Sequence, residues 1–459
     1  MGVYISTPFL ARLCSMQKTV LGTVSCVAAE HVMTRILQAG DPEGHFRRAL
    51  AQFPFPEISE NILKKYFVKD GIPKGKKFKP AGALNLRPSP DLIKLMIVAS
   101  FAFVWLAKEG HSEPISVNYL EKIQIPHIYH LTGAMLGGVD YVTMGAGITL
   151  QIPSVLDAIS SGGNPSYRVQ VEGSKDGFAT ISFNPSEFFG RKLPEMKRPG
   201  FLPIISTDVL GKLMTKRLPS GSIQGFVLEL PTAGGHNAPP RDKGIFDEKG
   251  QPVYGPRDEV AFDKLQDLGI PFWIGGSFAS PEGLAKAQSL GAVGIQAGSI
   301  FALSENSGME SNFRSEIRRQ GWNKELVIRT DPNASPTGFP FKLIQLAGTQ
   351  SDKVIYEARK RVCNICLLRT LHVHKDKIEY RCSSEPIFNY LSKGGKVEDT
   401  VGARCLCNVL LSAAGFGNPE EPPAFTLGDD VSFLRHLMKD SNDSYTAEQA
   451  VSYLLGQKT

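Results

Sequence analysis

Long hydrophobic runs are missing from this sequence of 459 residues. The most apolar stretch, Leu92 to Leu106, covers 15 residues, whereas a helix that spans a bilayer needs about 20. The N-terminus also lacks the basic segment followed by an apolar one that marks a secretory signal. We therefore expect neither a membrane span nor a membrane partner.

Cysteine is scarce as well. The chain has seven cysteines, an odd number with uneven spacing, and this does not match the paired pattern of a secreted disulfide framework. A reducing cytoplasm is the expected location.

No strong excess of one charge is present either. The net charge of +6 suits an anionic ligand such as a phosphate-bearing cofactor, but nucleic-acid-binding proteins gather lysine and arginine on one face or arm. The single dense basic run, residues 74–79, includes Gly75 and is followed by Pro80, and we interpret it as a solvated loop. Nucleic acid is therefore not an expected partner.

Short β-branched runs alternate with amphipathic helical patterns through the first two thirds of the chain. This alternation is typical of a parallel sheet covered by helices, and so of an α/β fold. Seven runs are predicted as strands, namely 20–25, 115–119, 141–144, 202–206, 226–229, 272–275 and 293–296. A closed (β/α)₈ TIM barrel needs eight strands, so the pattern is one strand short.

The remaining segments are assigned around these strands. The apolar run 92–106 is predicted as a buried helix, because Ser89 and Pro90 supply an N-cap and a first-turn proline. Two helical patterns at 42–80 and a hairpin within 167–201 are expected as insertions. We place the barrel at residues 1–311 and a mainly helical C-terminal extension, or cap, at 312–459.

Two glycine-bearing strand ends late in the chain suggest a phosphate site. Gly275, Gly276 and Ser277 follow one predicted strand, and Gly298 and Ser299 follow the next. In a (β/α)₈ barrel these are the loops after strands seven and eight, where phosphate groups bind. Glycine lets backbone N–H groups approach the phosphate, and serine adds hydroxyl donors.

A histidine stands at the end of the preceding strand. Gly234 and Gly235 come directly before His236, and they allow the backbone to pass close to a planar ligand. Catalytic residues lie at the C-terminal ends of barrel strands, and an imidazole suits proton transfer near neutral pH. His236 is therefore the predicted catalytic residue.

These motifs resemble a known family. The Ala-Gly-Gly-His turn, the Gly-Gly-Ser-Phe turn and the Gln-Ala-Gly-Ser-Ile-Phe segment are similar to the nitronate monooxygenase (2-nitropropane dioxygenase-like) family, over residues 1–305 and most specifically over 226–303. That family is similar in fold and flavin site to flavin-dependent enoyl-acyl-carrier-protein reductases. The Asn-Ala-Pro-Pro-Arg continuation and the long C-terminal extension resemble a bacterial subgroup of it.

The resemblance implies non-covalent FMN, with its phosphate on the two glycine-bearing loops. It also implies that Asn118 and Glu229 contact the flavin ring, although Glu229 stands where better-studied members have glutamine. His236 falls on the family's catalytic histidine. Arg241 is predicted either as an anion clamp for the substrate or as a surface residue.

The N-terminus departs from the family's pattern. The family opens with a strand that runs into Gly-Gly-Met-Gly, and this chain starts at Met1-Gly2. We therefore expect the first barrel strand to be absent, with two open sheet edges as a result.

Five of the seven cysteines lie between residues 363 and 407, with His372 and His374 among them. The pair Cys363 and Cys366 has zinc-like spacing, but the Cys-x-Cys pair at 405–407 is poorly spaced for a tetrahedral site. We expect buried or redox-idle thiols and no metal.

Three functions remain open on the sequence. The first is oxidation of nitronates or nitroalkanes by FMN and dioxygen. The second is NAD(P)H-dependent reduction of an enoyl thioester, and the third is a truncated, cofactor-free remnant or binding scaffold. A homodimer is a further expectation, since members of such families often pair.

Overall fold

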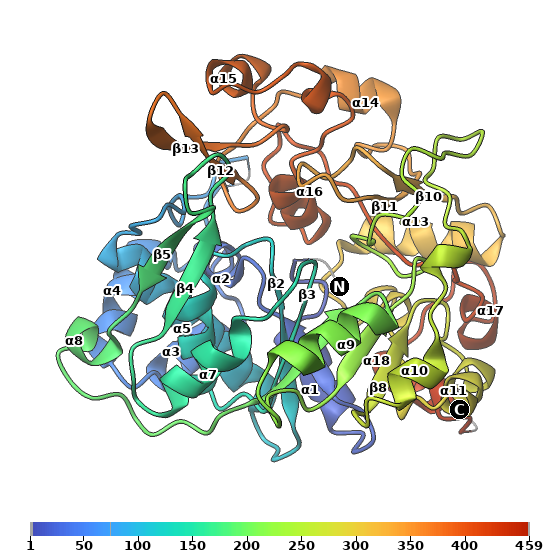
Figure 1. Cartoon of the computed structure of the whole chain (residues 1–459), viewed down its shortest axis with the longest axis horizontal. Helices are drawn as coiled ribbons and strands as arrows, with labels where there is room; N and C mark the ends of the chain where they lie inside the picture. The colour runs from blue at the N-terminus through green and yellow to red at the C-terminus, as the bar shows by residue number, and fades with distance from the viewer. Residues whose placement is uncertain (1–2, 74, 458–459) are drawn as a thin grey trace.

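A parallel sheet forms the centre of the computed structural model, which describes residues 3–73 and 75–457 (Figure 1). Its strands are neighbours in chain order, and each pair is parallel. They are β1 (Gly22–Ser25), β2 (Ile115–Leu120), β3 (Tyr141–Gly145), β6 (Gly200–Ile205), β7 (Phe226–Glu229), β8 (Phe272–Gly275) and β9 (Gly294–Gln296). The seven predicted strands and the α/β fold are thus confirmed.

The sheet is curled into a half-barrel. Asn118 of β2, Gly145 of β3, Glu229 of β7 and Gln296 of β9 line one and the same cavity, although β2 and β9 lie near opposite ends of the strand order. In parallel strands the carboxyl ends share one edge, so this curvature brings seven strand ends around a single space.

Helices cover the outside of the sheet. They begin at prolines or polar caps in several cases, as Thr7 and Ser280 show, because these residues satisfy or omit the first free N–H groups. The helices of this layer are α1 (Pro8–Ser15), α2 (Ala29–Gln38), α5 (Pro90–Lys108), α6 (His127–Leu136), α7 (Ile152–Ser160), α9 (Asp208–Arg217), α10 (Phe262–Gln266), α11 (Pro281–Ser289) and α12 (Ser299–Ala302).

The apolar run is the buried helix that the sequence predicts. The Ser89 side chain accepts a hydrogen bond of 3.3 Å from the amide of Leu92, and Pro90 opens the helix. By length and composition α5 resembles a membrane span, but 78% of its most apolar window is buried inside the protein. It packs against α1, α2 and α6, so it is a core helix.

Between β1 and β9 the sheet is open within the described residues. Met1 and Gly2, which carry the comparison with the Gly-Gly-Met-Gly motif, lie outside them. Residues 5 and 6 are hydrogen-bonded to both sides of this opening. The amide of Ser25 in β1 donates to the carbonyl oxygen of Ser6 at 3.0 Å, and the amide of Gly308 donates to the carbonyl oxygen of Ile5 at 3.1 Å. Helix α18 (Ala447–Leu454) packs on α1, α11 and α12 and covers this side.

The two predicted insertions contain the expected elements. Segment 42–80 carries α3 (His45–Ala51) and α4 (Pro56–Tyr66). The antiparallel pair β4 (Ser166–Gln170) and β5 (Phe178–Ser182) begins one residue before the predicted segment 167–201, and α8 (Pro185–Phe189) follows it. Lys74 of the basic run lies outside the described residues. Lys76 and Lys77 are exposed in a loop, as expected.

The C-terminal segment contains more than helices. Two antiparallel hairpins interrupt it, and the sequence does not signal them because their strands are short and one turn is Lys375–Asp376 rather than an Asn-Gly type. Its elements are α13 (Ser311–Trp322), β10 (Ile328–Asp331), β11 (Phe341–Ile344), α14 (Lys353–Ala358), β12 (Thr370–His374), β13 (Lys377–Arg381), α15 (Ile387–Ser392), the 3₁₀ turn η2 (Glu398–Thr400), α16 (Leu406–Ala413), α17 (Leu434–Leu437) and α18. A second 3₁₀ turn, η1 (Pro256–Asp258), lies in the barrel region between β7 and α10. In Figure 1, α14, α15, α16 and the β12–β13 hairpin lie together on one side of the molecule.

A buried carboxylate ties the helices behind the sheet together. Glu30 of α2 is 0% exposed, and its Oε2 lies 3.3 Å from Nε2 of His130 on α6. Burial alone raises the pKa of Glu30, but the charge and hydrogen bond of His130, helped by His31, outweigh it and hold the pKa at about 2. The charged form of Glu30 therefore stabilises the fold.

We expect Glu30→Gln to lower the free energy of unfolding by about 3 kcal/mol, because it removes one partner of a buried pair. The depressed pKa gives the sign: this stability is present above pH 4.5 and is lost as the pH falls toward 2. Urea unfolding at pH 7 measures the difference. Glu43→Gln is the control, since Glu43 pairs with His45 on the surface and its loss changes stability by less than about 1 kcal/mol. Equal effects of the two variants would contradict the assignment.

Candidate functional site

One cavity lies at the carboxyl edge of the curled sheet. It measures about 1720 Å³, counted with its open mouth, and residues of the C-terminal segment form its far wall. The structure brings ten of the eleven predicted site residues to this cavity: Asn118, Glu229, Gly234, Gly235, His236, Gly275, Gly276, Ser277, Gly298 and Ser299.

The two glycine-bearing loops present free backbone donors. Within the part of the chain that the structure describes, the amides of Gly276, Ser277, Gly298 and Ser299 have no hydrogen-bond acceptor. Gly276 has a φ of +111°, and a Cβ there would lie 2.7 Å from Oγ1 of Thr232. Ser277 has a positive φ of 57°. This turn places several N–H groups beside one another, which is the arrangement that binds an anion.

An irregular segment of the C-terminal region lies directly against these loops. The amide of Gly428 donates to Oγ of Ser299 at 2.8 Å, and the amide of Gly235 donates to Oγ1 of Thr426 at 2.7 Å. A Cβ on Gly234 would lie 2.6 Å from the carbonyl carbon of Leu427. A glycine is thus needed at position 234 because the backbone of Leu427 lies so close. The sequence suggests a different reason, the close approach of a planar ligand.

His236 is oriented by a residue nearly one hundred positions away. Its Nε2 lies 2.7 Å from Oγ of Ser335, which in turn bonds Oγ1 of Thr337 at 2.7 Å. The ring packs edge-on against Phe341, with centroids 4.9 Å apart. Burial and the nearby Lys122 lower the pKa of His236 well below its usual value. The imidazole is therefore neutral at pH 7, with one nitrogen held by Ser335.

A lysine that the sequence does not single out lies close enough to Glu229 and His236 for its charge to act on both, although it does not line the cavity. Lys122 follows β2, and its Nζ is buried, without a hydrogen-bond partner among the described residues, 3.5 Å from the centre of the Phe339 ring. Burial lowers the pKa of Lys122 to about 7, against the attraction of Glu229. Burial likewise raises the pKa of Glu229 to about 7, against the attraction of nearby positive charges, that of Lys122 among them. The two groups change charge in the same pH range.

Arg241 is the predicted residue that the structure does not bring to the cavity. Its side chain is exposed, and its backbone amide donates to Asp258 at 2.9 Å. The prediction of an anion clamp is therefore corrected: Arg241 is the surface residue that the sequence left as the alternative. Most residues of 241–249, in the loop that follows His236, are exposed to solvent. The sequence pattern does not predict this exposure.

The C-terminal cysteines are close to this cavity but are not joined. All seven cysteines are free thiols; Cys405 and Cys407 are buried, and Cys407 lines the cavity. The Sγ atoms of Cys363 and Cys366 lie 3.9 Å apart. Both of these side chains are half-buried.

Comparisons with known proteins give similarity of shape. No protein-family model matches the chain, and no curated protein matches it. Solved structures that it resembles include FabK from Thermotoga maritima, with 14% identity and a TM-score of 0.47 over 99% of this chain and 90% of that one. A nitroalkane oxidase from Streptomyces ansochromogenes has 11% identity and a TM-score of 0.46 over 100% of this chain and 93% of that one.

The enoyl reductase domain of MlnA, from the macrolactin biosynthesis cluster of Bacillus amyloliquefaciens, is also similar. It has 10% identity and a TM-score of 0.41 over 79% of this chain and 87% of that domain. At these identities and TM-scores, the function of this chain has to be inferred from the residues of its own cavity.

Proposed function

We propose that this protein is an FMN-dependent oxidoreductase that oxidises nitronates or nitroalkanes with dioxygen. The observation that carries the proposal is the convergence on one cavity of two loops with free amides and a neutral, oriented histidine. A location in the cytoplasm is proposed with it, since all seven cysteines are free thiols.

The residues of the cavity fit FMN. The amides of Gly276, Ser277, Gly298 and Ser299 would hold the phosphate, because free N–H groups at glycine turns are good anion donors. Asn118 of β2 and Glu229 of β7 line the same cavity, where they would contact the ring system. When bound, FMN supplies the acceptor that takes electrons from the substrate and passes them to dioxygen.

His236 would handle the proton of the substrate. When its Nε2–H donates to Ser335, Nδ1 keeps a lone pair, and no protein partner for Nδ1 exists among the described residues. Nδ1 then removes the α-proton of a neutral nitroalkane. A nitronate has already lost that proton; in the other tautomer Nε2 accepts from the Ser335 hydroxyl, and Nδ1–H would donate to an oxygen of the nitronate. The low pKa keeps the imidazole in its proton-accepting form at pH 7.

The visible absorption spectrum of the purified protein tests the proposal. Two flavin bands, with FMN released on denaturation, are expected, followed by oxygen consumption when propane-2-nitronate is added. A colourless protein that does not take up added FMN would overturn the proposal and favour a cofactor-free binding scaffold.

An enoyl-thioester reductase is the second candidate, and one observation favours it. The wall that the C-terminal segment contributes to the cavity is apolar, and an acyl chain would fit such a wall: it includes Leu367, Leu368, Leu406, Leu410 and Phe425. Rapid anaerobic bleaching of the flavin by NADH or NADPH would identify this activity. No bleaching, together with turnover of nitronate, would identify the oxidase.

The charge of the site is expected to control substrate affinity. Because the pKa values of Glu229 and Lys122 both lie near 7, the pair becomes more negative as the pH rises through neutrality. An anionic nitronate should therefore bind more weakly as the pH rises. In Glu229→Gln the negative charge cannot form, so the KM of the variant lacks the increase that this charge causes in the wild type. The ratio of wild-type KM to variant KM is therefore expected to rise several-fold between pH 6 and pH 8.

This ratio isolates the protein groups, because the substrate ionises identically in both assays. Glu248→Gln is the control, since Glu248 is exposed on the loop that leads away from the cavity. Its ratio should stay constant with pH. A constant ratio for Glu229→Gln as well would show that Glu229 does not titrate near pH 7.

A further inference from the structure

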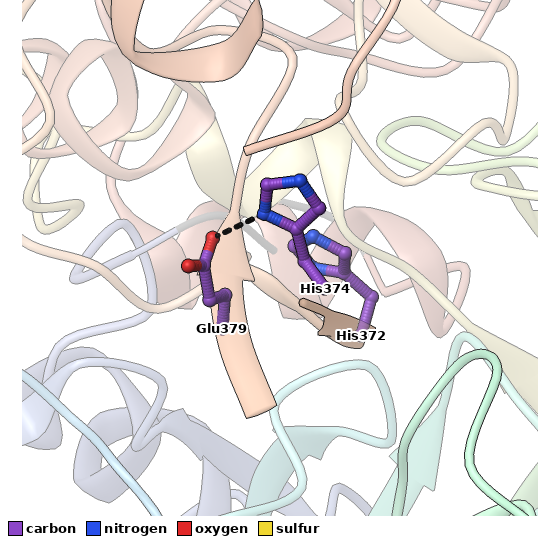
Figure 2. Close-up of side chains that lie close together, drawn as sticks. All are labelled: His372, His374 and Glu379. Carbon is purple, nitrogen blue, oxygen red and sulfur yellow. Dashed lines mark hydrogen bonds and ion pairs between the residues drawn. The ribbon is translucent and has the colours of Figure 1, made fainter. Parts of the chain in front are cut away.

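A second cluster of ligand-type side chains lies on the β12–β13 hairpin, outside the cavity (Figure 2). His372 and His374 are two residues apart on β12, so their side chains share one face of the strand. Glu379 is the direct partner of His372 on β13. The turn that joins the strands, Lys375–Asp376, has positive φ at both residues, as a tight two-residue hairpin requires.

The three side chains are close enough to share one ion. One ligand atom from each lies within 4.8 Å of the others. Nδ1 of His374 is 3.2 Å from Oε2 of Glu379, and the two imidazole rings are stacked with centroids 6.1 Å apart. Figure 2 shows the His374 ring and the Glu379 carboxylate facing each other, with His372 beside them.

His372 has the hydrogen bonding of a metal ligand. It is 5% exposed, and its Nε2 lies 2.7 Å from the carbonyl oxygen of Lys393, which can only accept. Nε2 therefore carries the proton, and Nδ1 keeps a lone pair. This Nδ1 is buried and has no partner among the described residues. Metal-binding histidines donate their other N–H to a carbonyl in this way, whereas a buried nitrogen without any partner is costly.

Nearby cations are occupied by other acceptors. Arg381 bonds Glu172 at 3.2 Å and the carbonyl of Gly394 at 2.9 Å. The Nζ of Lys393 bonds Glu385 at 2.7 Å. Lys377, which pairs with His374 across the hairpin, is exposed to solvent. The positive charges around the cluster are thus paired or solvated, and a cation is not opposed by an unpaired buried charge.

We propose that His372, His374 and Glu379 bind one divalent transition-metal ion of the zinc class. Two imidazoles and one carboxylate are typical zinc donors, and water would complete a tetrahedral set. Magnesium and calcium prefer oxygen ligands alone, so they are excluded by the donor set. The site does not depend on the function proposed for the cavity.

The ion would cross-link the two strands of the hairpin, which is itself hydrogen-bonded to the rest of the protein. The amide of Val373 donates to the carbonyl of Glu172 at 2.8 Å, and the amide of Glu172 donates to that of Leu371 at 2.9 Å, so β12 already joins the insertion that carries β4 and β5. Leu367 and Leu368, shortly before β12, line the cavity. Metal binding is therefore expected to stabilise the C-terminal wall of the cavity.

Zinc titration of the full chain, stripped of metal with a chelator, tests the site. We expect one Zn²⁺ per chain by calorimetry and mass spectrometry, and no binding of Mg²⁺. His374→Ala and the isosteric Glu379→Gln are each expected to weaken Zn²⁺ binding at least tenfold. Zn²⁺ in excess should raise the melting temperature of the wild type by a few degrees and leave that of Glu379→Gln unchanged.

Two controls separate the histidines from other zinc ligands. His436→Ala removes an exposed histidine on α17 and should leave the affinity for Zn²⁺ unchanged. The double variant Cys363→Ser/Cys366→Ser should retain one Zn²⁺ per chain. The proposal is overturned if wild type binds no Zn²⁺, if Glu379→Gln, folded by circular dichroism, binds it as tightly as wild type, or if only the cysteine variant loses it.

Discussion

Gly276→Ala protein is expected to bind FMN about 100-fold more weakly than wild type, which corresponds to about 2.7 kcal/mol. The new Cβ would lie 2.7 Å from Oγ1 of Thr232 and 3.0 Å from the amide nitrogen of Ala233. The alanine backbone would also have to adopt a φ of +111°. The turn must shift to relieve these contacts. The free amides of Gly276 and Ser277 would then no longer point to one position, and the anion would lose its donors.

Fluorescence titration of FMN into the cofactor-free protein measures this change. Gly244→Ala is the matched control: Gly244 also has a positive φ, of +81°, but a Cβ there meets nothing within 4 Å. Both variants carry the backbone cost of alanine at a positive φ, which is about 1–2 kcal/mol. They differ in the close contacts of the new Cβ, which only Gly276→Ala makes and which displace the turn with its amides. If both variants bind FMN as wild type does, the phosphate does not lie on this turn.

The strands and the strand-end residues could be predicted from the sequence because they depend on local patterns. Runs such as Phe272–Gly275 are short, apolar and followed by glycine, and that combination indicates a buried strand and a turn. Parallel strands place their carboxyl ends on one edge. Once the strand order is assumed, residues as distant as Asn118 and Ser299 must approach each other, and both do line the cavity.

The residues that orient the site could not be predicted in this way. Ser335 and Thr426 are separated from their partners His236 and Gly235 by 99 and 191 positions, and they lie in irregular loops that carry no periodicity. Lys122 is an ordinary charged residue in the sequence, and only the fold shows that its Nζ is buried beside Phe339. Contacts of this kind depend on how the C-terminal segment packs on the barrel, which local patterns do not specify.

His236→Ala is expected to lower kcat for a nitroalkane by 100-fold to 10,000-fold, in the range of about 10²–10⁴ that a positioned general base contributes. Because the phosphate donors are backbone amides on other loops, the variant should keep FMN and its two absorption bands. Ser335→Ala keeps the imidazole but removes its hydrogen bond at Nε2, so a smaller loss, about tenfold, is expected. Stopped-flow reduction of the flavin under anaerobic conditions measures both.

The choice of substrate gives this prediction its specificity. A nitronate has already lost its α-proton, so a base has nothing to remove from it, and the loss of kcat in His236→Ala should be much smaller with propane-2-nitronate than with 2-nitropropane. If His236 contributed only packing against Phe341, at a centroid distance of 4.9 Å, both substrates would lose activity equally. Equal losses would therefore contradict a role in proton transfer, and a loss confined to the nitroalkane would place the proton on the imidazole.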